Sequence, residues 1–278
     1  MTSTRRIALV GDPVVGSVSP AMQNAAFGAM ALPFEYVLHP VPRGELAAAF
    51  PGLRERYAGL NVTTPHKEAA RGLVASLGEA ARACGSVNTV VFRPGEALGD
   101  STDGAGFIRA LRRGAARRAL RRALVLGAGG AARAIAAALM AEGADVCVWA
   151  RDGAAARAIA RDIAGVWAVS GGGLDDELRR ADLLASAIPA SAWSGDQPPL
   201  PPDVELRPPL TVFDLVYRPR RTPLLDRAGR AGCVTVEGIE MLIEQGALSF
   251  SMWTGQAAPV EVMRQAAYEA LAIEPVRA

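Results

Sequence analysis

The chain alternates short apolar runs with stretches whose apolar residues recur at helical spacing. Apolar runs at residues 7–11, 34–41, 57–64 and 86–92 predict strands in the first part of the chain, and runs at 123–127, 182–190 and 210–217 predict strands further along. Helical stretches follow at about 20–30, 43–50, 66–77, 239–254 and 260–273, and residues 109–122 are predicted to form a helix plus a turn. Strands and helices in this order predict an α/β protein with a mainly parallel sheet.

Length and composition make two domains the expectation. The 278 residues are half hydrophobic and include no low-complexity tail, so they can bury two cores of ordinary size. Ser19 is a plausible cap of the first helix, with Pro20 at its first turn. The proline-rich stretch 194–209 is predicted to be a surface loop.

The charge balance argues against nucleic acid and membranes as partners. Thirty basic and 28 acidic side chains give a net charge of +2. The arginine-rich run 109–122 lacks interleaved aromatic residues, so we interpret it as a connecting helix plus a solvated turn between domains. No uncharged stretch reaches the roughly 18 residues of a membrane span. Three cysteines at irregular spacing match neither a metal site nor a disulfide framework. We therefore expect a cytoplasmic protein that holds no metal and binds a small polar molecule. We expect it to be a monomer or a homodimer.

Lysine usage carries a separate signal. Of the thirty basic residues, only Lys67 is a lysine. Arginine keeps its proton near neutral pH whereas lysine can release it, so position 67 is one where an amine is needed. Chance under a bias toward arginine is the alternative. Asparagine is also rare and occurs only at Asn24, Asn61 and Asn88.

A glycine-rich turn between a strand and a helix predicts a dinucleotide site. In GAGGAARA, residues 127–134, Gly127 permits the tight turn, Gly129 lets a pyrophosphate approach the backbone, and Ala132 allows close packing of the helix. After the next strand, Arg151 suits the 2′-phosphate of NADP, while Asp152 suits the free ribose hydroxyl of NAD. We predict NADP, with NAD as the alternative. The predicted cofactor residues here are Gly127, Ala128, Gly129, Gly130, Ala131 and Arg151.

A second group of polar residues lies in the first part of the chain. The turn NVTTPHK, residues 61–67, can direct Asn61, Thr63 and Lys67 into one cleft. The segments SVNTV and GDSTDGAGF add Asn88 and Asp103 at strand or loop edges. A lysine beside an aspartate is also what a surface ion pair looks like, so these residues alone leave both interpretations open.

At this point the sequence resembles the shikimate dehydrogenase family. The likeness is carried in order by GDPVVGSVSPAMQNAAF, NVTTPHK, CGSVNTV, GDSTDGAGF, the GAGGAAR turn, FDLVYRPRRTPLL and EGIEMLIEQGALSFSMWTG. The resemblance implies that Lys67 and Asp103 form the catalytic pair. It further implies substrate contacts from Ser17, Ser19, Thr63, Asn88, Tyr217 and Gln245, and cofactor contacts from Glu79, Leu215 and Gly238.

The resemblance also implies an activity and a domain layout. We expect NADPH-dependent reversible reduction of 3-dehydroshikimate to shikimate in aromatic amino acid biosynthesis, with Lys67 or Asp103 handling the proton. A quinate or aminoshikimate dehydrogenase and a non-catalytic dinucleotide sensor are the alternatives. The expected domains are an N-terminal α/β substrate domain with a mainly parallel sheet, residues 1–103 plus 237–278, and a doubly wound Rossmann-type NADP-binding domain, residues 104–236.

Overall fold

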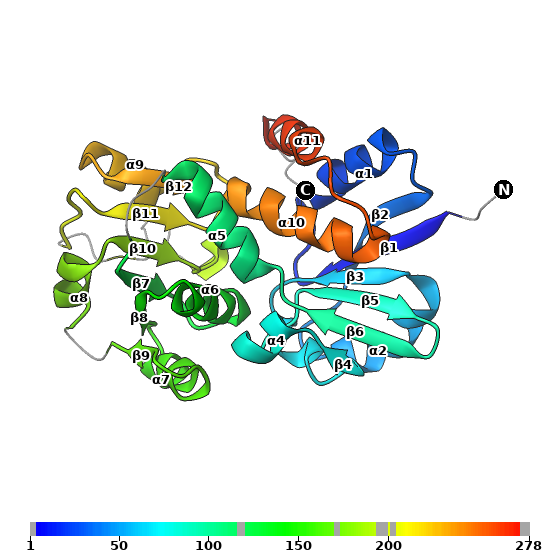
Figure 1. The fold of residues 1–278 in the computed structure, drawn as a ribbon, viewed down its shortest axis with the longest axis horizontal. Coiled ribbons are helices and arrows are strands. Elements are labelled where there is room, and N and C mark those ends of the chain that lie inside the picture. The colour runs from blue at the N-terminus through cyan, green and yellow to red at the C-terminus, as the bar shows by residue number, and fades with distance from the viewer. Residues whose placement is uncertain (1–3, 116–119, 170–172, 193–199, 201–203, 273–278) are drawn as a thin grey trace. The chain divides into compact units, whose positions relative to one another are not determined.

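The computed structural model describes residues 4–115, 120–169, 173–192, 200 and 204–272 (Figure 1). The chain forms two compact units, unit 1 with Met1–Gly106 and Leu242–Ala278, and unit 2 with Phe107–Met241. The division falls after residues 106 and 241, where the sequence suggested 103 and 236. That each unit is a functional domain with the expected role stays a prediction.

Unit 1 contains a six-stranded mixed sheet. In the order β2-β1-β3-β5-β6-β4, its strands are β2 (Phe34–Pro40), β1 (Arg5–Gly11), β3 (Gly59–Val62), β5 (Thr89–Arg93), β6 (Glu96–Asp100) and β4 (Ser76–Leu77). Strand β5 runs antiparallel to both of its neighbours, and the other neighbouring strands pair in parallel. The parallel core of the sheet was predicted. The hairpin of β5 and β6 was not, although Pro94 and Gly95 form a turn signal between the two strands.

The helices of this part of the chain differ in detail from the sequence prediction. They are α1 (Ser19–Ala29), α2 (Leu46–Arg56), α3 (Lys67–Ala70), α4 (Glu79–Cys84) and α11 (Val260–Ala272), which packs on α1. The single helix predicted over 66–77 is wrong, because α3 ends at Ala70 and residues 76 and 77 pair with β6 as a strand. The predicted cap of α1 is displaced by one residue, since Val18 is the cap and Ser19 begins the helix.

Unit 2 contains an all-parallel sheet of six strands. In the order β12-β11-β10-β7-β8-β9, its strands are β12 (Val234–Glu237), β11 (Thr211–Asp214), β10 (Leu183–Ser186), β7 (Arg122–Leu126), β8 (Asp145–Trp149) and β9 (Trp167–Ala168). The chain winds outward from β7 in both directions, which is the doubly wound Rossmann order. The predicted fold class is therefore confirmed.

Helices α6 (Gly130–Ala141), α7 (Gly153–Asp162), α8 (Leu174–Arg180) and α9 (Pro223–Arg230) connect these strands, with the short 3-10 helix η2 (Ala190–Ala192). Two longer helices cross the division of the chain, α5 (Asp103–Gly114) and α10 (Gly238–Thr254). The arginine-rich run 109–122 was predicted as a connecting helix plus a solvated turn; α5 ends at Gly114, and residues 116–119 lie outside the described chain. Most of the predicted loop at 194–209 lies outside it as well.

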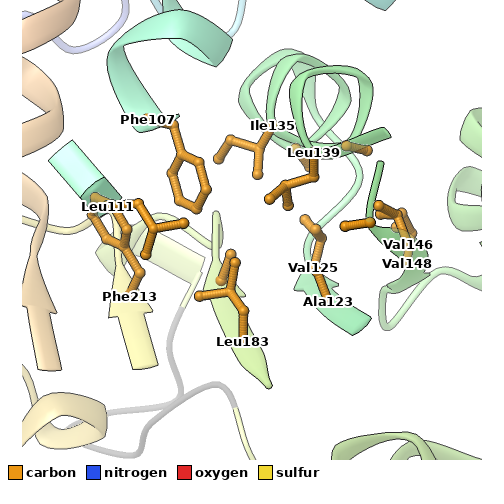
Figure 2. Close-up of a cluster of buried hydrophobic side chains, with 14 of the residues drawn as sticks. Phe107, Leu111, Ala123, Val125, Ile135, Leu139, Val146, Val148, Leu183 and Phe213 are labelled. Carbon is orange, nitrogen blue, oxygen red and sulfur yellow. The ribbon is translucent and has the colours of Figure 1, made fainter. Parts of the chain in front are cut away.

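The core of unit 2 is packed by side chains from helices and strands together (Figure 2). Phe107 of α5 stacks on Phe213 of β11 with ring centroids 4.6 Å apart. Ile135 and Leu139 of α6 are fully buried in the same cluster. Unit 1 has its own separate apolar cluster, which includes Val10, Leu60 and Val90 among other residues. Each sheet therefore organises a core of its own.

Among the helices described here, none is sufficiently long and apolar to span a bilayer.

Candidate active site

Polar residues converge at one edge of the sheet of unit 1. Strands β1 and β3 are parallel and end at this edge, where their continuations carry two serines and a turn with Lys67. Because β5 is antiparallel, it begins at the same edge, directly after Asn88. Strand β6 ends there too, and α5 follows it at Asp103. The strand directions thus collect the predicted residues of this unit at one edge: Ser17, Ser19, Thr63, Lys67, Asn88 and Asp103.

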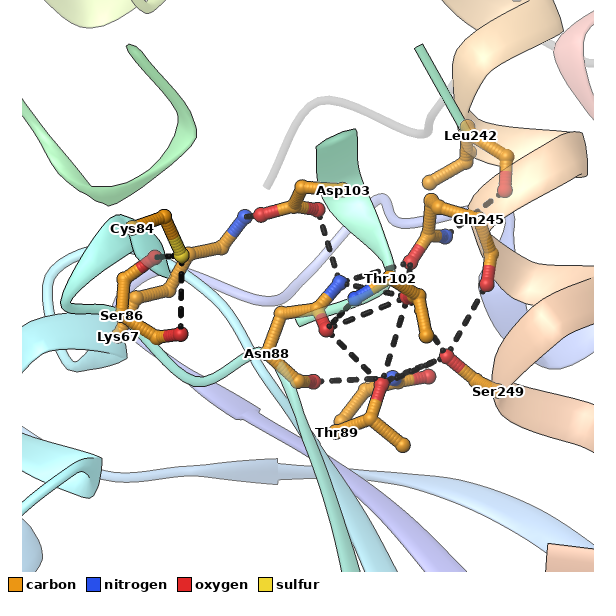
Figure 3. Close-up of polar contacts among 11 residues, drawn as sticks. Lys67, Cys84, Ser86, Asn88, Thr89, Thr102, Asp103, Leu242, Gln245 and Ser249 are labelled. Atoms are coloured by element: carbon orange, nitrogen blue, oxygen red, sulfur yellow. Dashed lines mark hydrogen bonds and ion pairs between the residues drawn. The ribbon is translucent and has the colours of Figure 1, made fainter. Parts of the chain in front are cut away.

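Lys67 and Asp103 form a largely buried ion pair (Figure 3). The Nζ atom of Lys67 lies 2.5 Å from Oδ2 of Asp103, and the two side chains are 14% and 4% exposed. Asn88 Nδ2 donates a hydrogen bond of 2.8 Å to the other carboxylate oxygen, Oδ1. Both oxygens of Asp103 are engaged, while the ammonium keeps further N–H donors. This burial excludes the interpretation as a solvated surface pair.

Asn88 is the hub of the polar network around this pair. Its Nδ2 lies 3.2 Å from Oε1 of Gln245, which α10 contributes. Its Oδ1 accepts a hydrogen bond of 2.8 Å from the backbone N–H of Thr102. Gln245 is itself oriented by donation from Nε2 to the carbonyl of Leu242 at 2.8 Å. As Figure 3 shows, the network joins the catalytic candidates to a helix from the far end of the sequence.

The side chain of Asn61 does not serve as the sequence suggested. It is buried, its Oδ1 accepts from the hydroxyl of Tyr36 at 2.8 Å, and its Nδ2 donates to Ser249 Oγ at 3.1 Å. Thr89 completes this group, with its Oγ1 2.7 Å from Ser249 Oγ. The rarity of asparagine drew attention to Asn61, but nothing in the sequence singled out Tyr36, Thr89 or Ser249. This hydrogen-bonded group of residues lies beside Asn88 and helps to hold it in position.

Two serines lie together at the start of α1. Ser17 Oγ donates to Ser19 Oγ at 3.1 Å and accepts from the backbone N–H of Ser19 at 3.2 Å. Thr63 follows β3, and its hydroxyl has no hydrogen-bond partner among the described residues, while its backbone N–H donates to Val10. Hydroxyl groups beside a helix N-terminus suit a carboxylate ligand.

The glycine turn of unit 2 has the geometry of a pyrophosphate-binding loop. Gly127 follows β7 with a φ of 113°, and a Cβ there would lie 3.2 Å from the carbonyl carbon of Ala187. A Cβ on Gly129 would meet nothing within 4 Å, so the backbone at this position is open to a ligand. Helix α6 begins at Gly130, and its first N–H groups can receive an anion. Ala128 lies in the same turn, and Ala131 lies in the first turn of α6.

Two residues after β8, Arg151 and Asp152, differ in the contacts that their side chains make. The carboxylate of Asp152 caps α7 and accepts hydrogen bonds from the N–H groups of Ala154 at 2.9 Å and Ala155 at 3.4 Å. Arg151 is exposed and forms no ion pair with any residue that the structure describes. A carboxylate occupied as a helix cap is less available to a ribose hydroxyl. The arrangement therefore favours recognition of a phosphate by Arg151.

Leu215 and Gly238 lie against each other in unit 2. Leu215 follows β11 and Gly238 begins α10 after the neighbouring strand β12. A Cβ at position 238 would lie 2.3 Å from the carbonyl oxygen of Leu215, so only glycine allows this approach. Tyr217 is half-buried in the segment that follows Leu215. Glu79 belongs to unit 1, where it begins α4, and its predicted cofactor contact stays a prediction.

One buried carboxylate was not identified from the sequence. It anchors the segment that contains Leu215 and Tyr217. Asp214 is fully buried at the end of β11 and accepts a hydrogen bond of 2.7 Å from Thr222 Oγ1, which also caps α9. Its other oxygen accepts from the backbone N–H of Val216 at 3.3 Å. Burial raises the pKa of Asp214 to about 6, and these hydrogen bonds oppose the rise.

Comparison with known proteins agrees with the fold and the motifs. A family described as shikimate dehydrogenase substrate binding domain matches residues 9–90, and one described as shikimate 5′-dehydrogenase C-terminal domain matches residues 238–268. The chain is 44% identical to shikimate dehydrogenase (NADP(+)) of Methanopyrus kandleri over 96% of each chain.

Solved structures give the same result. Shikimate 5-dehydrogenase of Thermus thermophilus in complex with NADP(H) and shikimate is similar with a TM-score of 0.85 at 37% identity, over 96% of this chain and all of that one. Quinate dehydrogenase of Corynebacterium glutamicum in complex with NAD has a TM-score of 0.84 at 28% identity, over 96% and 100% of the two chains. Given the identity to curated relatives along nearly its whole length, the chain belongs to the shikimate dehydrogenase family.

Proposed function

We propose that this protein is an NADP-dependent oxidoreductase that reversibly reduces 3-dehydroshikimate to shikimate, a step in aromatic amino acid biosynthesis. The observation that carries the proposal is the buried pair of Lys67 and Asp103 within a polar network at the edge of the sheet. The names of the related proteins supply the substrate. The structure supplies the groups that such chemistry requires.

The residues at this edge match the groups of a hydroxylated ring acid. Ser17 and Ser19, at the start of α1, would receive the carboxylate of the substrate. Thr63, Asn88 and Gln245 would bind the ring hydroxyls, because their hydroxyl and amide groups can both donate and accept. Tyr217 is proposed as a further residue that binds the substrate.

Lys67 is proposed as the residue that exchanges the proton with the substrate. Charge develops on the carbonyl oxygen during reduction, and a positioned ammonium stabilises it and donates the proton. Asp103 holds the ammonium in place, since its two oxygens are already bound by Lys67 and Asn88. NADPH, when bound, supplies the hydride.

The cofactor is proposed to bind along the turn of unit 2. The turn from Gly127 to Ala131 and the first N–H groups of α6 would hold the pyrophosphate, which the open space at Gly129 allows. Arg151 would bind the 2′-phosphate, because Asp152 is committed to capping α7. Leu215 and Gly238 would line the nicotinamide. This set of residues supports NADP rather than NAD.

The central test is the variant Lys67→Met, assayed for shikimate oxidation at the absorbance of the reduced nicotinamide. Turnover should fall by about 10²–10⁴-fold, the usual contribution of a general acid or base, while binding of NADP⁺ stays unchanged. A methionine of similar length keeps the packing but removes the charge. A variant as active as the wild type would remove the proposed role. If both were inert and both bound NADP⁺, the protein would be a dinucleotide sensor.

Substrate choice is tested by comparing shikimate and quinate at equal cofactor concentration. Quinate carries an additional hydroxyl beside its carboxylate, and the small side chain of Ser19 leaves room for it. We expect the higher kcat/KM for shikimate. A higher value for quinate would assign the chain to that alternative within the same family.

A further inference from the structure

An arginine-lined pocket lies at the edge of the unit 1 sheet opposite to Lys67 and Asp103. Its volume is about 480 Å³, within the range of about 300–1,000 Å³ that is common for small-molecule sites. Residues 4–6, 54–58 and 92–95 line it. None of them belongs to the active-site candidates described above.

The sheet register places three segments around this pocket. The backbone N–H of Ala58 donates to the carbonyl of Arg6 at 2.7 Å, and the carbonyl of Ala58 accepts from Phe92 at 3.0 Å. The start of β1, the residue before β3 and the end of β5 are therefore adjacent. The C-terminal turn of α2 completes the wall. The pocket is thus held by hydrogen-bonded strand ends.

The lining is strongly cationic. It contains one acidic residue, Glu55, against five arginines: Arg5, Arg6, Arg54, Arg56 and Arg93. Arg6 pairs with Glu35 at 2.9 Å, and the guanidinium of Arg5 lies over the ring of Phe34. The remaining three form no ion pair within the described part of the chain, so their charges are not neutralised by the protein.

A helix end explains only part of this arrangement. Basic side chains in a last turn interact favourably with the helix dipole, and this accounts for Arg54 and Arg56 on α2. It does not account for Arg5, Arg6 and Arg93, which come from strand ends. The helix dipole therefore does not explain why the arginines of the helix end and those of the strand ends line the same pocket.

His39 is a titratable residue beside the pocket. Burial, together with the positive charge of Arg56, lowers the pKa of His39. The ring Nδ1 of His39 lies 2.9 Å from the hydroxyl of Tyr57, which lines the pocket. His39 therefore responds to the electrostatic potential at one wall of the pocket.

We propose that this pocket binds a small polyphosphate anion, of the kind carried by nucleoside triphosphates. The planar guanidinium forms paired hydrogen bonds with phosphate oxygens, and several of them around one pocket suit a ligand with several adjacent negative charges. A ligand with several phosphate groups can engage all three of the guanidinium groups that are unpaired within the described residues, those of Arg54, Arg56 and Arg93. The volume fits a small molecule rather than a polymer.

Binding is tested by calorimetric titration of the full-length protein with inorganic triphosphate. In the pocket variant, Arg54, Arg56 and Arg93 are replaced by glutamine, and affinity should fall about tenfold for each guanidinium that no longer binds phosphate. The control variant carries glutamine at Arg161, Arg180 and Arg230, which are exposed in unit 2. It removes the same net charge, so affinity should change less than threefold. Thermal melting and shikimate oxidation establish that both variants are folded.

The location of the ligand is tested by NMR of the histidine side chains, since the chain has only His39 and His66. Bound triphosphate should raise the pKa of His39 by screening Arg56, and His39→Gln assigns the signal. Absence of saturable binding, equal weakening in both variants, or no change in His39 would each overturn the proposal. It would also be overturned if single-stranded RNA or phosphatidylserine vesicles bound at the pocket and triphosphate did not.

Discussion

Replacing Asp214 by asparagine should change how the stability of the protein depends on pH. The carboxyl group is fully buried, and burial raises its pKa from 3.8 to about 6. An asparagine has the same shape and keeps an oxygen that accepts hydrogen bonds, but it does not titrate. The comparison therefore isolates the cost of holding this charge inside unit 2.

The sign and size follow from linkage between protonation and folding. Between pH 3.8 and about 6, the folded state holds a proton that the unfolded chain has released, so the wild type loses stability as pH rises. The complete effect is about 3 kcal/mol, of which about 2 kcal/mol falls between pH 4.5 and 7.5. Other acidic groups are common to both proteins and cancel in the difference.

The measurement is urea unfolding of the wild type and Asp214→Asn at several pH values, followed by circular dichroism. The free energy of unfolding of the variant, minus that of the wild type, should increase by about 2 kcal/mol from pH 4.5 to 7.5. In Thr222→Val, which removes a donor to the carboxylate, the stability should fall more steeply with pH. A difference between wild type and Asp214→Asn that is constant over this range would refute the reasoning.

Two further substitutions test packing and cofactor choice. Phe107→Ala removes a ring that is fully buried and stacked on Phe213, and we expect a loss of about 3–5 kcal/mol in urea unfolding; a loss below about 1 kcal/mol would show that this stack contributes little. Arg151→Gln should raise KM for NADPH about tenfold and leave KM for NADH nearly unchanged. In contrast, Asp152→Ala should cost about 1 kcal/mol of stability, because α7 loses its cap. The preference for NADPH should not change. A shift in that preference would mean that Asp152 contacts the ribose.

The sequence predicted the Rossmann sheet well because each of its main strands is a short apolar run. The glycine turn could also be predicted, because few residues other than glycine adopt a backbone conformation such as that of Gly127. The early end of the helix predicted over 66–77 could not be predicted from the sequence, because it depends on the pairing of residues 76 and 77 with β6. Tertiary contacts of this kind leave little local signal.

The candidate site divides in the same manner. Lys67 was singled out by being the only lysine, and its partner Asp103 by the resemblance to a family. The sequence did not distinguish a buried pair from a surface pair, and the exposed fractions of these side chains decide that question. Asp214 and Ser249 were missed because an aspartate in a strand and a serine in a helix are ordinary until their burial is known.

Strand β5 runs from the end of the sheet with Lys67 and Asp103 to the end with the arginine-lined pocket. Its length sets the distance between these two sites. Asn88 precedes it at one end and Arg93 closes the other, which at about 3.3 Å per residue is a span of about 17 Å. Lys67 and Asp103 carry opposite charges 2.5 Å apart, so a distant charge at the arginine end acts on the two groups with opposite signs and its effects largely cancel. The ion pair of Lys67 and Asp103 therefore depends little on the charge of the arginine pocket, and that pocket can bind an anion without disturbing the pair.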